Sequence, residues 1–171
     1  MRPLEPPDSF HLLAAQGWLE LGCPTEAGEE LEKIAPELSM RPDVLGTRWE
    51  ACARLGNWEA GVEIGQRLVE AEPEQSFGWI NRSYALRRAP GGGVQAAYEA
   101  LRPAADRVAD LEQVNFNLAC YACQLGRLDE GREWLSKSLA IAQRDGRLHF
   151  ARQNALNEPD LEALWNEIRK L

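Results

Sequence analysis

Residues 42–75 read PDVLGTRWEACARLGNWEAGVEIGQRLVEAEPEQ, and the fold prediction rests on the pattern of this stretch. Pro42 suits the first turn of a helix, where the missing N–H of proline costs no hydrogen bond. Apolar residues recur at helical spacing on both sides of Gly56, which interrupts the pattern, and Pro73 ends the second run. The stretch therefore predicts two antiparallel helices joined by a short turn.

The same pattern recurs along the chain with a period of 34 residues. Gly22 precedes Gly56 by 34 residues, and Gly126 follows it by 70, which is two periods plus two extra residues in the loop at 90–93. The period predicts a single domain over 8–171, after a flexible start at 1–7. Its parts are four helical pairs and a capping segment: about 8–41, 42–75, 76–111, 112–145 and 146–171.

The quoted stretch resembles a tetratricopeptide repeat (TPR). Gly56, Trp58, Leu68 and Pro73 fall where that pattern has a turn glycine, a turn aromatic, a core aliphatic and a closing proline. The resemblance covers residues 8–143 and implies an all-α fold, a right-handed α-solenoid of antiparallel helix pairs, the TPR superhelix. The C-terminal segment resembles the tails that follow such repeats in bacterial proteins of this class.

Several residues predict where individual helices begin or end. Ser9 can cap the first helix, and Pro36 makes the end of the second helix irregular. Pro103 lies inside the sixth run and should kink it or cut it short. The residues 110–113 resemble the start of a capping box, and Pro159 stands near the first turn of a final helix.

The charge is unevenly distributed. The chain of 171 residues has a net charge of −8; residues 1–75 contain 15 acidic and 6 basic residues, whereas 76–171 contain 12 and 13. An acidic N-terminal half repels phosphate backbones, so we expect no nucleic-acid partner, although it would attract a basic segment of another protein. The alternative explanation of the acidic N-terminal half is a solvated surface that only keeps the protein soluble. No apolar stretch approaches the roughly 18 residues of a membrane span, and the N-terminus lacks signal-peptide order, so we expect a cytoplasmic protein without membrane contact.

No chemistry of an enzyme is visible in the sequence. The pair Cys120 and Cys123 has no second pair and no matching histidines, as zinc would require, and we expect reduced, structural thiols. His11 and His149 are lone residues without an evident cysteine or carboxylate partner. The glycines at 91–93 do not continue into a phosphate loop. We therefore predict no catalytic residue, no metal, no cofactor and no enzyme activity.

In such a stack the first helix of each pair lines a concave groove. The register of the family places these residues in it: Gln16, Glu20, Thr47, Glu50, Arg54, Phe77, Ile80, Asn81, Tyr84, Arg88, Gln113, Phe116, Asn117, Cys120 and Gln124. Aromatic residues such as Tyr84 and Phe116 can anchor side chains, and the amides of Asn81 and Asn117 can bind a peptide backbone.

These residues favour a non-enzymatic protein–protein interaction scaffold, adaptor or chaperone-like, that binds a peptide or protein segment in the groove. Some family members bind the terminal carboxylate of chaperone tails, but only Asn81 matches their residues here, so we do not expect that specificity. Arg82, Arg87 and Arg88 either form a basic site or pair with neighbouring glutamates. The alternative is a structural protein that homo-oligomerises, for example as a homodimer, with the groove filled by its own C-terminal cap or by a second copy.

Overall fold

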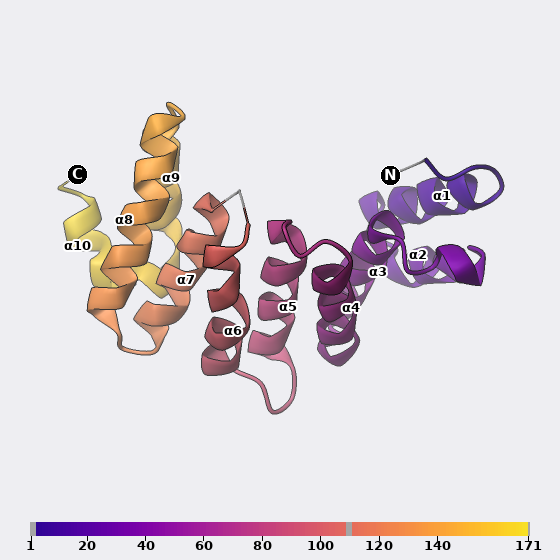
Figure 1. Cartoon of the computed structure of the whole chain (residues 1–171), viewed down its shortest axis with the longest axis horizontal. Helices are drawn as coiled ribbons and strands as arrows, with labels where there is room; N and C mark the ends of the chain where they lie inside the picture. The colour runs from indigo at the N-terminus through magenta and orange to yellow at the C-terminus, as the bar shows by residue number, and fades with distance from the viewer. Residues whose placement is uncertain (1–2, 109–110, 171) are drawn as a thin grey trace.

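A computed structural model describes residues 3–108 and 111–170 and shows the predicted all-α solenoid. Figure 1 shows the helices in a row, with the two ends of the chain at opposite ends of the molecule. The α-helices are α1 (Asp8–Glu20), α2 (Pro24–Leu31), α3 (Pro42–Leu55), α4 (Trp58–Ala71), α5 (Ser76–Arg88), α6 (Val94–Leu101), α7 (Glu112–Gln124), α8 (Leu128–Arg144), α9 (Leu148–Asn157) and α10 (Trp165–Ile168). The 3-10 helices are η1 (Pro36–Leu38), η2 (Arg102–Asp106) and η3 (Pro159–Leu164).

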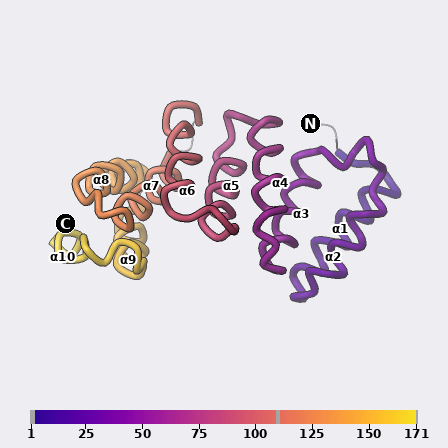
Figure 2. Tube along the Cα trace, turned by 90° about the horizontal axis from the view of Figure 1, so that it is seen from below, coloured from indigo at the N-terminus to yellow at the C-terminus, as the bar shows by residue number. Residues whose placement is uncertain are grey.

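Helices that follow one another in the chain pack against each other, as a solenoid requires. The most extensive contacts join α4 to α5 and α7 to α8, so neighbours are held both within and between pairs. The pair α1–α2 runs across the direction of α4, α5 and α6 (Figures 1 and 2). The stack therefore turns where α2 meets α3.

The turn glycines explain the 34-residue period. Gly56 and Gly126 have φ angles of 71° and 74°, the left-handed region that residues with a Cβ avoid. At the first of these turns the N–H of Asn57 donates to the carbonyl of Cys52 at 2.9 Å, and the side chain of Asn57 accepts from the N–H of Ala60. Each such turn reverses the chain within a few residues and makes the flanking helices antiparallel.

The apolar core is divided along the stack. A large cluster lies between α4 and the C-terminal helices and includes Leu101, Leu118 and Leu161. A second cluster joins α1, α2 and α3, and a small third one, built on Leu45, lies between α3 and α4. The middle of the molecule thus has less core of its own and depends on close packing between helices.

Several helix ends differ from the sequence prediction. Ser9 does not cap α1, because that helix begins at Asp8 after Pro7 and has no side-chain cap. The Asp8 carboxylate accepts instead from the N–H of Ala35 at 2.7 Å, which ties α1 to the chain after α2. Pro36 begins η1, in keeping with an irregular end of the second helix.

The prolines of the second half act at helix ends. The prediction for Pro103 is confirmed, because α6 ends at Leu101 and the chain continues as η2. The predicted final helix is instead the short η3, which begins at Pro159, followed by α10. The capping-box interpretation at 110–113 lies partly outside the described residues; α7 begins at Glu112 without a side-chain cap.

Candidate functional site

The first helices of successive pairs place equivalent residues on one face. Tyr84 of α5 and Cys120 of α7 are separated by the period plus the two inserted residues, and Glu50 of α3 precedes Tyr84 by one period. Tyr84 is 40% exposed, whereas Cys120 is 4% exposed. The groove is therefore open along α3 and α5 and covered at α7.

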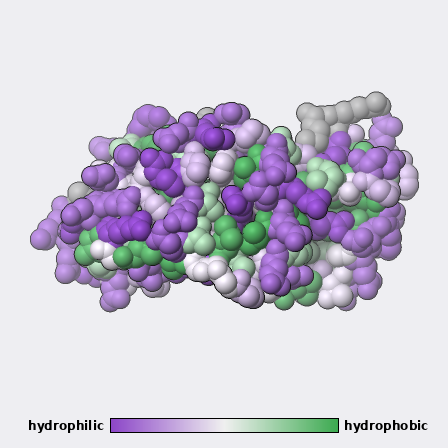
Figure 3. Space-filling view, turned by 60° about the horizontal axis from the view of Figure 1, so that its bottom comes forward, coloured by the Kyte–Doolittle hydropathy of each residue, from purple (hydrophilic) through white to green (hydrophobic). Residues whose placement is uncertain are grey.

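The open part contains a shallow cavity of about 410 Å³, open to solvent, between α3, α4 and α5. It is lined by Trp49, Glu50, Ala53, Arg54, Trp58, Asn81 and Tyr84. The Tyr84 ring lies 6.1 Å from the Trp49 ring and 5.9 Å from the Trp58 ring, both edge to face. Such geometry is favourable for aromatic pairs and holds the three rings in place without ligand. Figure 3, coloured by hydropathy, shows aliphatic side chains (green) at the middle of the molecule and again over its C-terminal half.

An unpaired amide is the most informative polar group of this cavity. Asn81 is only 8% exposed, and its buried Nδ2 has no hydrogen-bond partner among residues 3–108 and 111–170. The indole N–H of Trp49 is also buried and lacks a partner within the same residues. Because a buried donor without a partner costs about 1–3 kcal/mol, such groups are usually satisfied by a ligand or by water.

Charged groups border the same cavity. Arg54 donates to Glu50 at 2.5 Å, so these two charges neutralise each other. The Arg88 guanidinium lies 3.4 Å from the centre of the Tyr84 ring and 5.4 Å from that of Trp58, and it donates to the Tyr84 carbonyl. The stacking fixes Arg88 over the aromatic rings at the edge of the open groove.

The C-terminal segment covers the groove face of α7. η3 packs on α7, and Asp160 accepts two hydrogen bonds from Arg87 of α5, one of them at 2.9 Å. The hydrogen bonds that Arg87 donates to Asp160 raise the pKa of Arg87, whose guanidinium also lies 5.7 Å from the centre of the Tyr121 ring. Since Arg87 lies one turn after Tyr84 on the same face of α5, Asp160 reaches into the groove itself.

The structure separates the predicted groove residues by exposure. Those on the surface are Gln16, Glu20, Glu50, Arg54, Phe77, Tyr84, Arg88, Gln113 and Gln124. Those half-buried or buried are Ile80, Phe116, Asn117, Thr47, Asn81 and Cys120. Only four of them, Glu50, Arg54, Asn81 and Tyr84, line the cavity together.

Trp49 and Trp58 belong to this cavity although sequence reasoning did not place them there. Trp49 is one of the apolar residues that recur at helical spacing before Gly56, a pattern typical of a core position, and the family pattern gives Trp58 as a turn aromatic. Both interpretations overlook that the turn at Gly56 returns the start of α4 to the end of α3, so that Trp58 comes close to Arg54 and Ala53. Two tryptophans flanking a turn glycine were the available signal.

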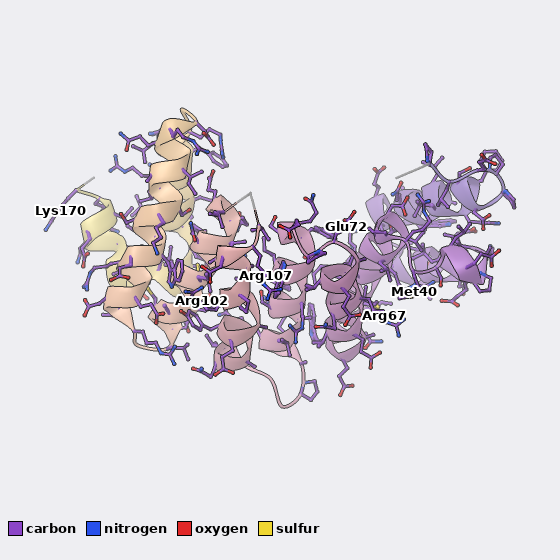
Figure 4. The ribbon with its side chains drawn as sticks, in the orientation of Figure 1. Met40, Arg67, Glu72, Arg102, Arg107 and Lys170 are labelled. Atoms are coloured by element: carbon purple, nitrogen blue, oxygen red, sulfur yellow. The ribbon has the colours of Figure 1, made fainter. Side chains whose placement is uncertain are left out.

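The three arginines of α5 do not form one basic site. Arg87 pairs with Asp160, Arg88 stacks on Tyr84, and Arg82 borders an open hollow on another face. In that hollow, Met40 and Arg67 lie against each other (Figure 4), with 3.1 Å between Nη1 and the sulfur. An acidic partner would therefore meet separate charges rather than a cluster.

The thiols and histidines have structural surroundings. Burial raises the pKa of the Cys120, Cys123 and Cys52 thiols, which keeps them protonated and unreactive near neutral pH. His11 does have a carboxylate partner, contrary to the sequence interpretation, because its Nδ1 lies 2.9 Å from Glu30.

Within residues 3–108 and 111–170, no group of three or more His, Cys, Asp or Glu side chains could hold a metal ion. Over the same ranges no helix combines the length and apolar character of a membrane span.

Solved structures identify the fold as that of a TPR protein. TTC0263, a thermophilic TPR protein from Thermus thermophilus, superposes with a TM-score of 0.63 and 20% identity over 96% of this chain and all of that chain (100%). A point mutant of MamA superposes with a TM-score of 0.60 and 17% identity, covering 96% of both chains. A second MamA structure, of MamA AMB-1, superposes with a TM-score of 0.60 and 16% identity, covering 96% of this chain and 98% of that one. No family model and no curated protein matches the sequence. The chain is thus a TPR-like helical-repeat protein by fold.

Proposed function

We propose that this protein is a non-enzymatic scaffold that binds an extended segment of another polypeptide in the open part of its groove, between α3 and α5. The cavity walled by Trp49, Trp58 and Tyr84 carries this proposal. Its volume of about 410 Å³ lies within the usual range of ligand pockets, roughly 300–1,000 Å³. It is large enough for one apolar or aromatic side chain of a partner.

The amide of Asn81 supplies the second element of recognition. An asparagine side chain offers a donor and an acceptor, which match the carbonyl and N–H of an extended backbone. A partner segment would insert an apolar side chain between the rings and place its backbone beside Asn81. The ion pair of Glu50 with Arg54, and Arg88 on Tyr84, would border the segment.

The alternative is a groove filled by the chain itself or by a second copy. The C-terminal segment covers Cys120 on α7 and reaches Arg87, yet Tyr84 and the cavity beside it stay exposed. The chain's own C-terminal segment thus covers the groove face of α7, and the groove faces of α3 and α5 stay available to a partner. A second copy in the open part would give a homodimer that depends on Tyr84.

A phage-displayed library of random peptides, selected on the full chain, tests the proposal. We expect selected peptides to share an apolar anchor and to lose affinity about tenfold or more on Tyr84→Ala and on Asn81→Ala, as for interface hot spots. The control is Glu70→Ala, an exposed residue in the hollow on the other face. All variants should keep native helicity by circular dichroism.

Peptides whose affinity is unaffected by Tyr84→Ala and Asn81→Ala would refute the assignment of the groove. Sedimentation velocity distinguishes the alternative, since a dimer that Tyr84→Ala converts to monomer would show that a second copy fills the site.

A further inference from the structure

A second surface, at the N-terminal end of the stack, is apolar and is not covered by any part of residues 3–108 or 111–170. Phe10 and Leu13 of α1 are each 63% exposed, and Leu21, directly after α1, is 73% exposed. A Cβ placed on Gly17, which lies between them on this face, would meet no atom within 4 Å. These residues recur at three- and four-residue spacing and form one stripe along the helix, here called the α1 outer stripe.

The opposite face of α1 is also apolar. Leu12, Ala15 and Leu19 are buried against α2 and α3. A helix that is apolar on both faces is normally covered on both, and α1 is covered on one. Exposed apolar patches of this kind mark interaction surfaces.

The two helices at this end, α1 and α2, contain acidic residues but no lysine or arginine of their own. Residues 8–31 contain five acidic residues and no lysine or arginine. Glu20 follows Leu13 by seven residues and so lies along one edge of the stripe. At the other edge Glu30 of α2 is already paired with Lys33, at 2.7 Å, and lies 2.9 Å from Nδ1 of His11. Glu26 lies one turn before Glu30 on the same face of α2 and is exposed.

We propose that the α1 outer stripe binds a basic amphipathic helix, whose apolar face packs on Phe10, Leu13 and Leu21 and whose lysines or arginines face Glu20 and Glu26. Opposite charges along both edges orient such a helix and accelerate its association. The same acidic edges repel an anionic membrane surface, and they oppose the pairing of two α1 helices from two copies. The acidic edges therefore favour a cationic helix over an anionic membrane or a second copy of α1.

Fluorescence anisotropy with two labelled peptides tests this proposal on the full chain. One peptide places Leu and Lys at helical spacing, and the other has Glu in place of every Lys. We expect the Lys peptide to bind, with an affinity that falls as salt rises, and the Glu peptide not to bind. The double variant Leu13→Gln, Leu21→Gln should weaken binding about tenfold or more, as should Glu20→Lys, Glu26→Lys. Each of these side chains is exposed, so the fold should be retained, as circular dichroism and thermal unfolding can verify.

Phe150→Gln is the matched control, because Phe150 is a similarly exposed aromatic residue (68%) in the other half of the chain. It should leave the affinity for the Lys peptide unchanged. Equal binding of the two peptides, absence of binding, or full binding by the Leu13→Gln, Leu21→Gln protein would each overturn the proposal. So would a wild-type dimer that the same double variant converts to monomer, which would show that a second copy covers the stripe.

Discussion

The groove faces of α5 and α7 occupy equivalent places in the repeat, yet one is open and the other closed. At the centre of the α5 face Tyr84 is 40% exposed, and at the centre of the α7 face Cys120 is 4% exposed. The difference comes from η3, which packs on α7 and bonds α5 through Asp160. A repeat position therefore predicts which way a side chain points, but not whether solvent reaches it.

The closed half is held by burial. Leu161 and Leu164 of η3 are 0% and 1% exposed and belong to the large core cluster. The open half is held by helix contacts with little core of its own, in which Trp49, Trp58 and Tyr84 support one another. Substitutions should therefore affect the two halves differently.

The largest effect is expected for Leu161→Ala. Removal of this buried side chain should lower the free energy of unfolding by about 2–5 kcal/mol and loosen η3 from α7. Alkylation of Cys120 by iodoacetamide, followed by mass spectrometry, should then accelerate, because burial raises the pKa of this thiol and only the thiolate reacts. Cys52 on α3 should react at its wild-type rate. Phe150→Ala is the control for stability, and an unchanged rate at Cys120 would show that η3 does not protect it.

A smaller effect is expected for Gly65→Ala, which tests the open half. A Cβ on Gly65 of α4 would lie 2.7 Å from Cα of Arg82 on α5, so the helices must separate. We expect a loss of about 1–3 kcal/mol in urea denaturation, as for other overpacked sites. Gly28→Ala in α2 is the matched control; its Cβ meets nothing within 4 Å, and alanine should stabilise that helix by up to about 1 kcal/mol. Equal effects of the two substitutions would contradict close packing of α4 on α5.

The smallest effect is expected for Asp160→Asn, which tests the link between the halves. Arg87 would lose its charged partner, and we expect a decrease in stability of about 1–2 kcal/mol, since hydrogen bonds between charged groups contribute more than neutral ones. Amide hydrogen exchange in η3 should increase with it. Glu162→Gln changes an exposed carboxylate of the same segment and should have little effect. If both variants have the stability and the η3 hydrogen exchange of the wild type, the ion pair between Arg87 and Asp160 does not hold η3 in place.

Local signals in the sequence predicted most of the fold. The glycines at 56 and 126 need a left-handed backbone, and the apolar period fixes the buried faces, so both follow from short stretches of chain. The covering of α7 could not be predicted in this way. It rests on Arg87 in the third helical pair and Asp160 in the capping segment, which are 73 residues apart and are not related by the repeat. The cavity was predicted in part, since Tyr84 and Asn81 follow from the register, whereas Trp58 lines it only because of how the turn is folded.

The glycines between α4 and α5 have a mechanical consequence. A Cβ on Gly78 of α5 would lie 2.8 Å from the backbone nitrogen of Val69, so at Gly65 and Gly78 each helix touches the backbone of the other. At these two points no side chain lies between the helices that could slide or repack, and this makes the joint stiff. In the binding mode proposed above, the cavity beside this joint would be formed before a partner arrives, and most of the ordering entropy of binding would fall on the incoming segment. Stiffness at one joint would thus set how selective the whole groove can be.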